Sequence, residues 1–200
     1  MRGIVFLGAP DTDVKYLSDF IKEDDYIICA DSGYKYAKEL GCRIDAVMGD
    51  FDSIGIDKVD FEGAIIYPCE KDFTDCEIAM DFAIDKGIDE VVLVCAKGGR
   101  SDHFLANIYS LNKGLEKGVF AYIYSPGEKI YIAQNCFETK GKKGDVLSVI
   151  PIGKTKNYTT VNLKYSLDNE PLPYTGISNV FEDEWVKISF EGKAVIVHVF

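Results

Sequence analysis

Two carboxylates one residue apart, Asp50 and Asp52, have the spacing in this chain that most directly suggests chemistry. They lie in the segment Gly-Asp-Phe-Asp-Ser at residues 49–53, just past a short apolar run. Like charges this close raise each other's cost of ionisation unless a cation or strong hydrogen-bond donors lie between them. A divalent metal with oxygen ligands would meet that need. An acidic surface turn explains the same residues, because Gly and Asp are ordinary turn residues, so the pair alone leaves both interpretations open.

Three further polar clusters occur at comparable places along the chain. They are Asp31-Ser32-Gly33, Lys71-Asp72-Phe73-Thr74-Asp75 and Gly98-Gly99-Arg100-Ser101-Asp102-His103. In an open α/β sheet, ligands bind in the crevice beyond the carboxyl ends of the strands. Because all four clusters fall at or near such positions, a shared binding site explains them better than four unrelated turns, which would divide between the two edges of the sheet.

The cluster at residues 98–103 has the features of an anion site. Two glycines before Arg100 at a helix start leave backbone N–H groups and the positive end of the helix dipole facing outward. Arg100 adds a fork-shaped donor suited to phosphate. The segment is neither a Walker A loop, since the G-K-[ST] ending is missing, nor a G-x-G-x-x-G fingerprint. A plain Gly-Gly turn, with His103 bonded to a neighbour such as Asp102, is the alternative.

The other clusters have structural alternatives too. Asp31 and Ser32 could serve only to cap a helix that begins near Tyr34. Asp72 or Thr74 could likewise cap the helix that follows. Together, however, the carboxylates suit a hard cation, and Lys71 and Arg100 suit anionic oxygens, a combination typical of phosphoryl-type transfer. No Ser-His-Asp or Cys-His spacing suggests a covalent nucleophile. The residues alone therefore indicate a Mg²⁺-dependent, nucleotide-using transferase or hydrolase.

Composition bounds the other possibilities. The 200 residues are 47% hydrophobic, enough for one large or two small domains, and the formal net charge of −11 argues against nucleic-acid or anionic-membrane binding through a basic face. The six cysteines contain no C-x-x-C pair, and two of them, Cys29 and Cys95, lie in apolar strand-like runs. The apolar run near the N-terminus is too short for a signal peptide, and no run reaches membrane-spanning length. We expect a reduced, soluble, cytoplasmic protein.

The first 125 residues alternate between strand-like and helix-like segments. Strands are expected at 2–7, 26–30, 45–48, 64–67, 90–96 and 119–124, and helices at 11–22, at 34–40, after the cluster at 71–75, and after the cluster at 98–103. This alternation predicts an α/β fold with a parallel or mostly parallel sheet flanked by helices on both faces.

The helical period disappears after Ser125-Pro126-Gly127. Short β-like runs follow at 129–133, 135–139, 146–150, 158–163, 177–181, 185–190 and 194–199, as in a small antiparallel β-sandwich or barrel. We read His198, in one of these runs, as structural, and we expect Trp185 to anchor the β core. The predicted domains are residues 1–125 and 126–200.

The four clusters in this order, with Ala106-Asn107-Ile108, resemble the motif series of the thiamine pyrophosphokinase family. Residues 163–167 and 176–179 also resemble that family's pattern, so the resemblance covers nearly the whole chain. It implies an N-terminal α/β domain that binds ATP and Mg²⁺ and a C-terminal β-sandwich that binds thiamine. It also implies transfer of the pyrophosphoryl group of ATP to the hydroxyl of thiamine, with release of AMP. The family acts as a homodimer, with thiamine between the α/β domain of one subunit and the β domain of the other.

The resemblance also implies roles for individual residues. Asp50, Asp52 and Asp75 match the Mg²⁺ ligands, and Asp72 or Asp75 could orient or deprotonate the thiamine hydroxyl. Matches to nucleotide, phosphate or thiamine contacts are Asp31, Lys71, Thr74, Arg100, Asp102, His103, Asn107, Ser178 and Asn179. The aromatic residue that stacks on thiamine stays open among Trp185, Tyr165 and Phe181.

The sequence leaves two rival functions open. A related pyrophosphokinase could act on another alcohol such as a hydroxymethylpterin, although the Gly-Ile-Ser-Asn segment at 176–179 favours thiamine. A non-catalytic thiamine- or nucleotide-binding sensor is the rival from another class. It predicts loss of the metal carboxylates, and Asp50, Asp52 and Asp75 are all present.

Overall fold

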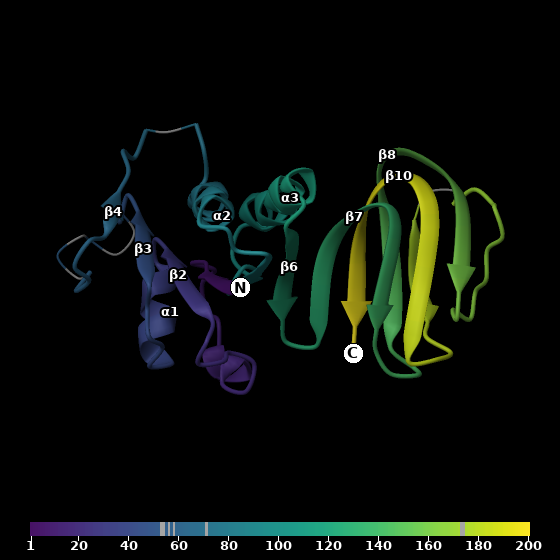
Figure 1. Cartoon of the computed structure of the whole chain (residues 1–200), viewed down its shortest axis with the longest axis horizontal. Helices are drawn as coiled ribbons and strands as arrows, with labels where there is room; N and C mark the ends of the chain where they lie inside the picture. The colour runs from purple at the N-terminus through teal and green to yellow at the C-terminus, as the bar shows by residue number, and fades with distance from the viewer. Residues whose placement is uncertain (53–54, 56, 58, 71, 173–174) are drawn as a thin grey trace. The chain divides into compact units, whose positions relative to one another are not determined.

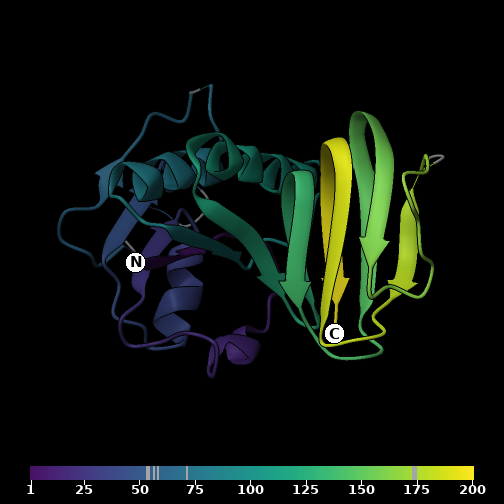
Figure 2. The same ribbon diagram turned by 45° about the vertical axis from the view of Figure 1, so that its right-hand side comes forward.

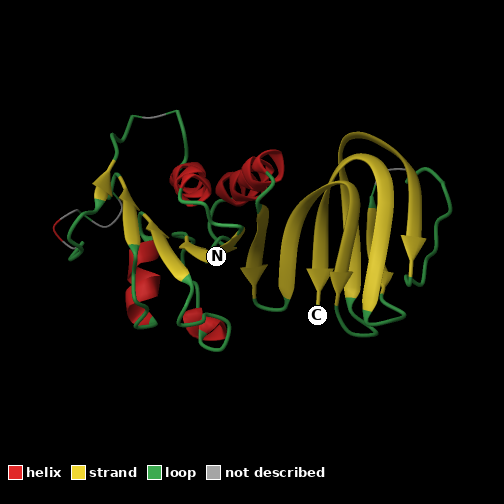
Figure 3. Cartoon of the chain, in the orientation of Figure 1, coloured by secondary structure: helices red, strands yellow, loops and turns green. Residues whose placement is uncertain are grey.

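The chain forms two compact units in a computed structural model, Met1–Pro126 and Gly127–Phe200. The structure describes residues 1–200 except 53, 54, 56, 58, 71, 173 and 174. Among the described residues, helices occur only in the first unit, and the second unit consists of strands and loops (Figure 3). The predicted class, an α/β fold followed by a C-terminal β-sandwich, is confirmed.

The first unit is built on a parallel sheet with the strand order β4-β3-β2-β1-β5-β6. Its strands are β1 (Arg2–Phe6), β2 (Tyr26–Ala30), β3 (Ala46–Gly49), β4 (Ile65–Ile66), β5 (Glu90–Val94) and β6 (Phe120–Ser125). Most of their residues are buried, as expected for parallel strands covered on both faces. The order reverses between β1 and β5, because the chain builds outward from β1 to β4 and then returns to β1's other side.

Helices cover both faces of this sheet. The 3₁₀ turn η1 (Val14–Leu17) and α1 (Gly33–Glu39) lie on one face, and α2 (Asp75–Asp85) and α3 (Ser101–Lys117) pack together on the other (Figures 1 and 2). The predicted helix at 11–22 is wrong beyond the single turn η1. The backbone N–H groups of Phe20 and Ile21 both donate to the carbonyl of Leu17 and close a last turn. Beyond it the backbone bonds to side chains: the carbonyl of Phe20 accepts from Arg2 Nη2 at 2.9 Å, and the N–H of Lys22 donates to Asp25 Oδ2 at 2.8 Å.

The second unit is an antiparallel arrangement in the order β7-β10-β8-β9. Its strands are β7 (Glu128–Lys140), β8 (Val146–Val161), β9 (Gly176–Val180) and β10 (Trp185–Val199). Each of the three long strands joins two of the runs that the sequence predicts as separate. Register shifts near residues 189–193 and positive φ angles at Asn135, Asn157 and Gly192 let the strands bend and continue, and their ribbons arch over in Figure 1.

The core of the second unit tests two sequence predictions. His198 is buried, its Nε2 lies 2.9 Å from Asp145 Oδ2, and its ring stacks on Phe181 with the centroids 4.8 Å apart, so a structural role is confirmed. Trp185, by contrast, is 39% exposed at the start of β10, and the prediction that it anchors the β core is wrong. Among the described helices, none has the length and apolar character needed to cross a membrane.

Candidate active site

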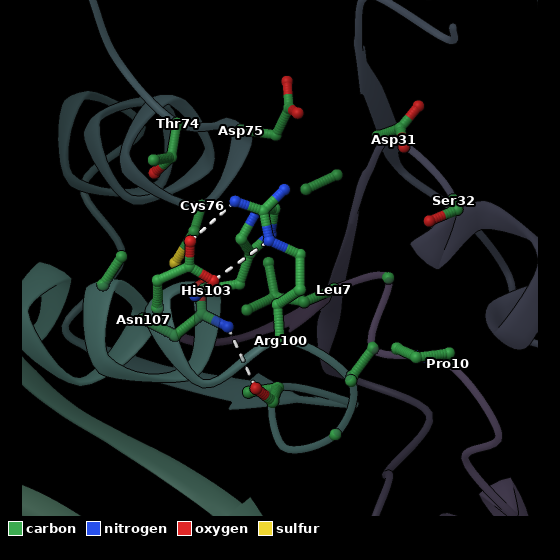
Figure 4. A pocket seen from close by; sticks show the side chains of 18 of the residues that line it. Leu7, Pro10, Asp31, Ser32, Thr74, Asp75, Cys76, Arg100, His103 and Asn107 are labelled. Carbon is green, nitrogen blue, oxygen red and sulfur yellow. Dashed lines mark hydrogen bonds and ion pairs between the residues drawn. The ribbon is translucent and has the colours of Figure 1, made fainter. Parts of the chain in front are cut away.

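A cavity of about 810 Å³ lies at the carboxyl ends of the strands of the first unit. Its walls come from the loops after β1, β2, β3 and β5 and from the first turns of α2 and α3. This is the edge at which the sheet reverses its strand order, where open α/β sheets bind their ligands. Figure 4 shows the Arg100 side chain between Cys76 and Asn107 on one wall and Asp31 and Ser32 on the other.

Three carboxylates converge at one wall of this cavity. One oxygen each from Asp31, Asp50 and Asp52 lies within 4.8 Å of the other two. Oxygen ligands from several carboxylates are what a hard divalent cation requires. Asp75, at the start of α2, lines the same cavity but is not a member of this group. Of the three carboxylates that the sequence predicts as metal ligands, the geometry therefore groups Asp50 and Asp52, and it joins Asp31 to them in place of Asp75.

Gly49 explains how these carboxylates come together. The backbone N–H of Asp31 donates to the carbonyl of Met48 at 2.8 Å, which carries the β2–β3 pairing past the end of β2. A Cβ atom at residue 49 would lie 3.0 Å from Asp31 Cα, and φ of Gly49 is +155°. Both the contact and the conformation favour glycine. Asp31 itself has φ of +44°, a strained conformation of the kind often found at functional sites.

We expect Gly49→Ala to separate the carboxylates as well as lower stability. The close contact and the unfavourable φ should cost about 1–3 kcal/mol of unfolding free energy, measured by urea denaturation, and most of the catalytic activity should be lost with it. Gly41→Ala is the matched control, because Gly41 has φ of +70° but no neighbouring atom within 4 Å of its Cβ position. The control should lose stability and keep activity; full activity in Gly49→Ala would contradict this account.

The loop after β5 forms the opposite wall. Gly98 and Gly99 have φ of +143° and +62°, and Cβ atoms there would meet Pro10 at 3.1 and 2.8 Å. The loop after β1 is fixed in turn, because the carbonyl of Ala9 accepts hydrogen bonds from the hydroxyls of Tyr36 and Thr12 at 2.6 and 2.9 Å. The two loops therefore lie against each other and place Arg100 directly before α3.

A neighbouring carboxylate, that of Asp102, holds the Arg100 side chain by two hydrogen bonds. Arg100 Nε and Nη2 donate to the two oxygens of Asp102 at 3.1 and 2.6 Å, although the side chains are 72% and 63% exposed. Hydrogen bonding to Arg100 lowers the pKa of Asp102 to about 2. Asp102 is therefore ionised at any pH near neutrality, and we expect no step in a pH–rate profile from this group.

The remaining predicted residues of α3 have distinct places. Asn107 Nδ2 donates to the carbonyl of Ala96 at 2.9 Å, which ties α3 to the loop after β5 (Figure 4). The backbone N–H of His103 donates to Asp102 Oδ1 at 3.0 Å, and the His103 side chain lines the cavity. Asn107 thus holds the wall in place, whereas His103 faces the space a ligand would fill.

The start of α2 forms the third part of the wall. Thr74 accepts from the backbone N–H of Glu77 at 3.2 Å, and Glu77 accepts from the backbone N–H of Thr74 at 2.9 Å, a capping box that fixes where the helix begins. Asp75 and Cys76 follow and line the cavity. Burial raises the pKa of the Cys76 thiol to about 12, so this side chain is a neutral wall and not a nucleophile. Lys71 lies outside the described residues, and Asp72 is exposed and not among the described residues that line the cavity.

Ser178 and Asn179 lie in β9, in the second unit. The Asn179 side chain accepts from the backbone N–H of Tyr165 and donates to the Tyr165 carbonyl, both at 2.8 Å. Ser178 has φ of +60° and its backbone N–H donates to Ser148 Oγ at 3.1 Å. The Asn179 side chain therefore holds the backbone of Tyr165, whose own side chain is exposed.

Several residues that line the cavity were not predicted from the sequence, and two examples differ in whether they could have been. The segment Gly8-Ala9-Pro10 lines the cavity. It follows β1 at the same edge of the sheet as the four clusters, so the rule that ligands bind at the carboxyl ends of the strands could have found it. Cys76 could not have been found, because a buried thiol carries no functional signal in the sequence.

Two family profiles match this chain, one in each unit. The profile described as "Thiamin pyrophosphokinase, catalytic domain" matches residues 17–123, and "Thiamin pyrophosphokinase, vitamin B1 binding domain" matches residues 134–195. A relative, the thiamine pyrophosphokinase of Bacillus subtilis (strain 168), is 29% identical over 181 residues, which cover 82% of this chain and 81% of the relative.

Solved structures lead to the same family. The crystal structure of thiamine pyrophosphokinase from Bacillus subtilis has a TM-score of 0.88 at 26% identity and covers 100% of this chain and 99% of its own. The Geobacillus thermodenitrificans structure gives 0.88 at 26% identity, with 100% and 98% coverage. The Candida albicans structure, at 16% identity, shares the fold with a TM-score of 0.80 and covers 100% and 88%. The chain belongs to the thiamin pyrophosphokinase family.

Proposed function

We propose that the protein transfers the pyrophosphoryl group of ATP to the hydroxyl of thiamine, forming thiamine diphosphate and AMP. The observation that carries this proposal is one cavity that has a cluster of three carboxylates on one wall and Arg100 with the Gly98-Gly99 loop on the other. Such a cavity suits a metal-bound polyphosphate, because the cation and the basic side chain neutralise charge on different oxygens. The family membership supports thiamine and ATP as the substrates.

Mg²⁺ fits the donor set of the cavity. Asp50 and Asp52 would hold it, with a third oxygen from Asp75, which the family resemblance implies, or from Asp31, which the geometry brings into the group. When bound, the metal would neutralise phosphate charge and orient the phosphates. Replacing Asp31 and Asp75 separately by Asn, and titrating Mg²⁺ in each variant, distinguishes the two candidates.

The chain's own residues would act on the phosphates and on the acceptor. Arg100 and the backbone N–H groups at the start of α3 would stabilise the charge that develops on the phosphates. The thiamine hydroxyl oxygen would bond to the β-phosphorus as the bond from that phosphorus to the α,β-bridging oxygen breaks, and AMP would leave with the bridging oxygen. The hydroxyl proton would pass to a carboxylate. Asp75 lines the cavity and Asp72 does not, which favours Asp75 for this task.

The second unit would supply the acceptor specificity. Residues 126–200 would form the thiamine-binding domain and residues 1–125 the ATP- and Mg²⁺-binding domain. The separate profiles matched at residues 17–123 and 134–195 support this division. Ser178 and Asn179 would contact thiamine, and Lys71 and Thr74 would contact substrate or phosphate. We further propose a cytoplasmic homodimer with the thiamine site at the subunit interface.

The experiment that tests this function is a coupled assay for AMP release. It compares ATP with thiamine, ATP with a hydroxymethylpterin, and ATP without an acceptor, all in the presence of Mg²⁺. AMP should appear only with thiamine. Release only with the pterin would identify a pyrophosphokinase of different specificity, and binding of thiamine or ATP without AMP would identify a sensor.

A further inference from the structure

Phe51 separates the two aspartates of the loop after β3 and points away from them. Its side chain is only 1% exposed, whereas Asp50 and Asp52 on either side line the cavity. The carboxylates need to face a ligand, and the ring between them needs to be buried. The loop satisfies both requirements over three consecutive residues.

The backbone makes this division possible. Phe51 has φ of +57°, the left-handed conformation that residues with a bulky side chain rarely adopt. Two hydrogen bonds close the turn around it: the N–H of Asp52 donates to Asp50 Oδ1 at 3.2 Å, and the N–H of Gly55 donates to the Phe51 carbonyl at 2.7 Å. A glycine would adopt this conformation without strain, so a glycine here would suffice if the turn alone mattered.

We infer that Phe51 is a positioning residue for the metal site: its buried ring anchors the strained turn that holds Asp50 and Asp52 beside Asp31. One oxygen of each of the three carboxylates lies within 4.8 Å of the other two, and like charges this close raise one another's cost of ionisation. Burial of the ring offsets both this cost and the unfavourable φ, so the anchor prepares the site before the cation arrives. This inference rests on the proposed Mg²⁺ site.

The test measures binding of Mn²⁺ alone, as a probe for Mg²⁺, by electron paramagnetic resonance without ATP. Phe51→Gly relieves the backbone strain and removes the anchor, and we expect it to raise the Kd for Mn²⁺ by about 10- to 100-fold, as for other residues that orient metal ligands. Phe51→Leu keeps a buried apolar side chain and should rescue the affinity to within about twofold. An equal or tighter Kd in Phe51→Gly would overturn the inference.

General destabilisation needs its own control. Leu111→Ala removes a buried side chain of α3 that is 1% exposed, and it should lower the melting temperature while leaving the Mn²⁺ Kd unchanged. Equal weakening in Leu111→Ala would overturn a specific role for Phe51. Should Phe51→Gly fail to fold, Phe51→Val serves instead, because a β-branched residue opposes the left-handed conformation; it should also weaken binding, and wild-type affinity in it would overturn the inference.

The same titration separates this inference from the proposed function. Wild-type protein that binds Mn²⁺ no better than Asp52→Asn would contradict the metal site itself, and the inference with it. Wild-type protein that binds Mn²⁺, with Phe51→Gly and Phe51→Leu indistinguishable from it, would overturn the role of Phe51 and leave the proposed function intact.

Discussion

Asp52→Asn should lower kcat for AMP formation by about 10²–10³-fold, because it removes one charged ligand from the site that neutralises the phosphates. The fold should survive. Asp52 is exposed and belongs to a group of three like charges, so its neutralisation relieves repulsion. We expect a melting temperature within about 2 °C of the wild type. Steady-state kinetics at saturating ATP and thiamine provide the measurement.

Asp85→Asn is the matched control for this substitution. Asp85 is an exposed carboxylate at the end of α2 and is not among the described residues that line the cavity. The control should retain wild-type kcat. Unchanged turnover in Asp52→Asn would remove this residue from the metal site and with it the main reason to place Mg²⁺ there.

Arg100→Ala should lower kcat/KM for ATP by about 10³-fold, a value within the range found when an arginine that stabilises phosphoryl transfer is removed. The guanidinium now bonds both oxygens of Asp102, and the same planar fork suits two phosphate oxygens. Arg100→Lys keeps the charge but loses the fork, so we expect it to recover only part of the activity.

The Arg100 prediction has an independent reference. Arg43→Ala removes another exposed arginine, one that pairs with Asp45 near the start of β3 and away from the cavity. Its kinetics should match the wild type. If Arg100→Lys were as active as wild type, charge alone would suffice and the bidentate role would be wrong.

The sequence predicted the first unit well because its strands are buried on both faces. Runs such as residues 26–30 and 91–96 are continuously apolar, so both the strands and the edge at which they end could be found. The polar clusters that follow β2, β3 and β5 lie around one cavity for the same reason. The grouping of Asp31 with Asp50 and Asp52 was not predictable, because it depends on how Asp31 bonds to Met48 across β2 and β3.

The sequence predicted the long strands of the second unit poorly. Asn135, Asn157 and Gly192 are typical turn residues, and the sequence places each of them in a gap between two predicted runs or at the edge of one. In the structure these residues adopt positive φ within or beside strands that continue, so they mark bends and not ends. Local composition cannot distinguish the two outcomes, since the pairing of β7 and β8 with β10 on both sides decides between them. The exposure of Trp185 is likewise set by its place at a strand end.

The fate of the β-phosphate of ATP tests the central claim most directly. Incubation of the protein with Mg²⁺, thiamine and [β-³²P]ATP should place the label in thiamine diphosphate and release AMP in equal amount. The label remaining in ADP, with thiamine monophosphate as the product, would show transfer of a single phosphoryl group and contradict the proposed reaction. Labelled pyrophosphate with AMP but no thiamine product would show hydrolysis and contradict it equally.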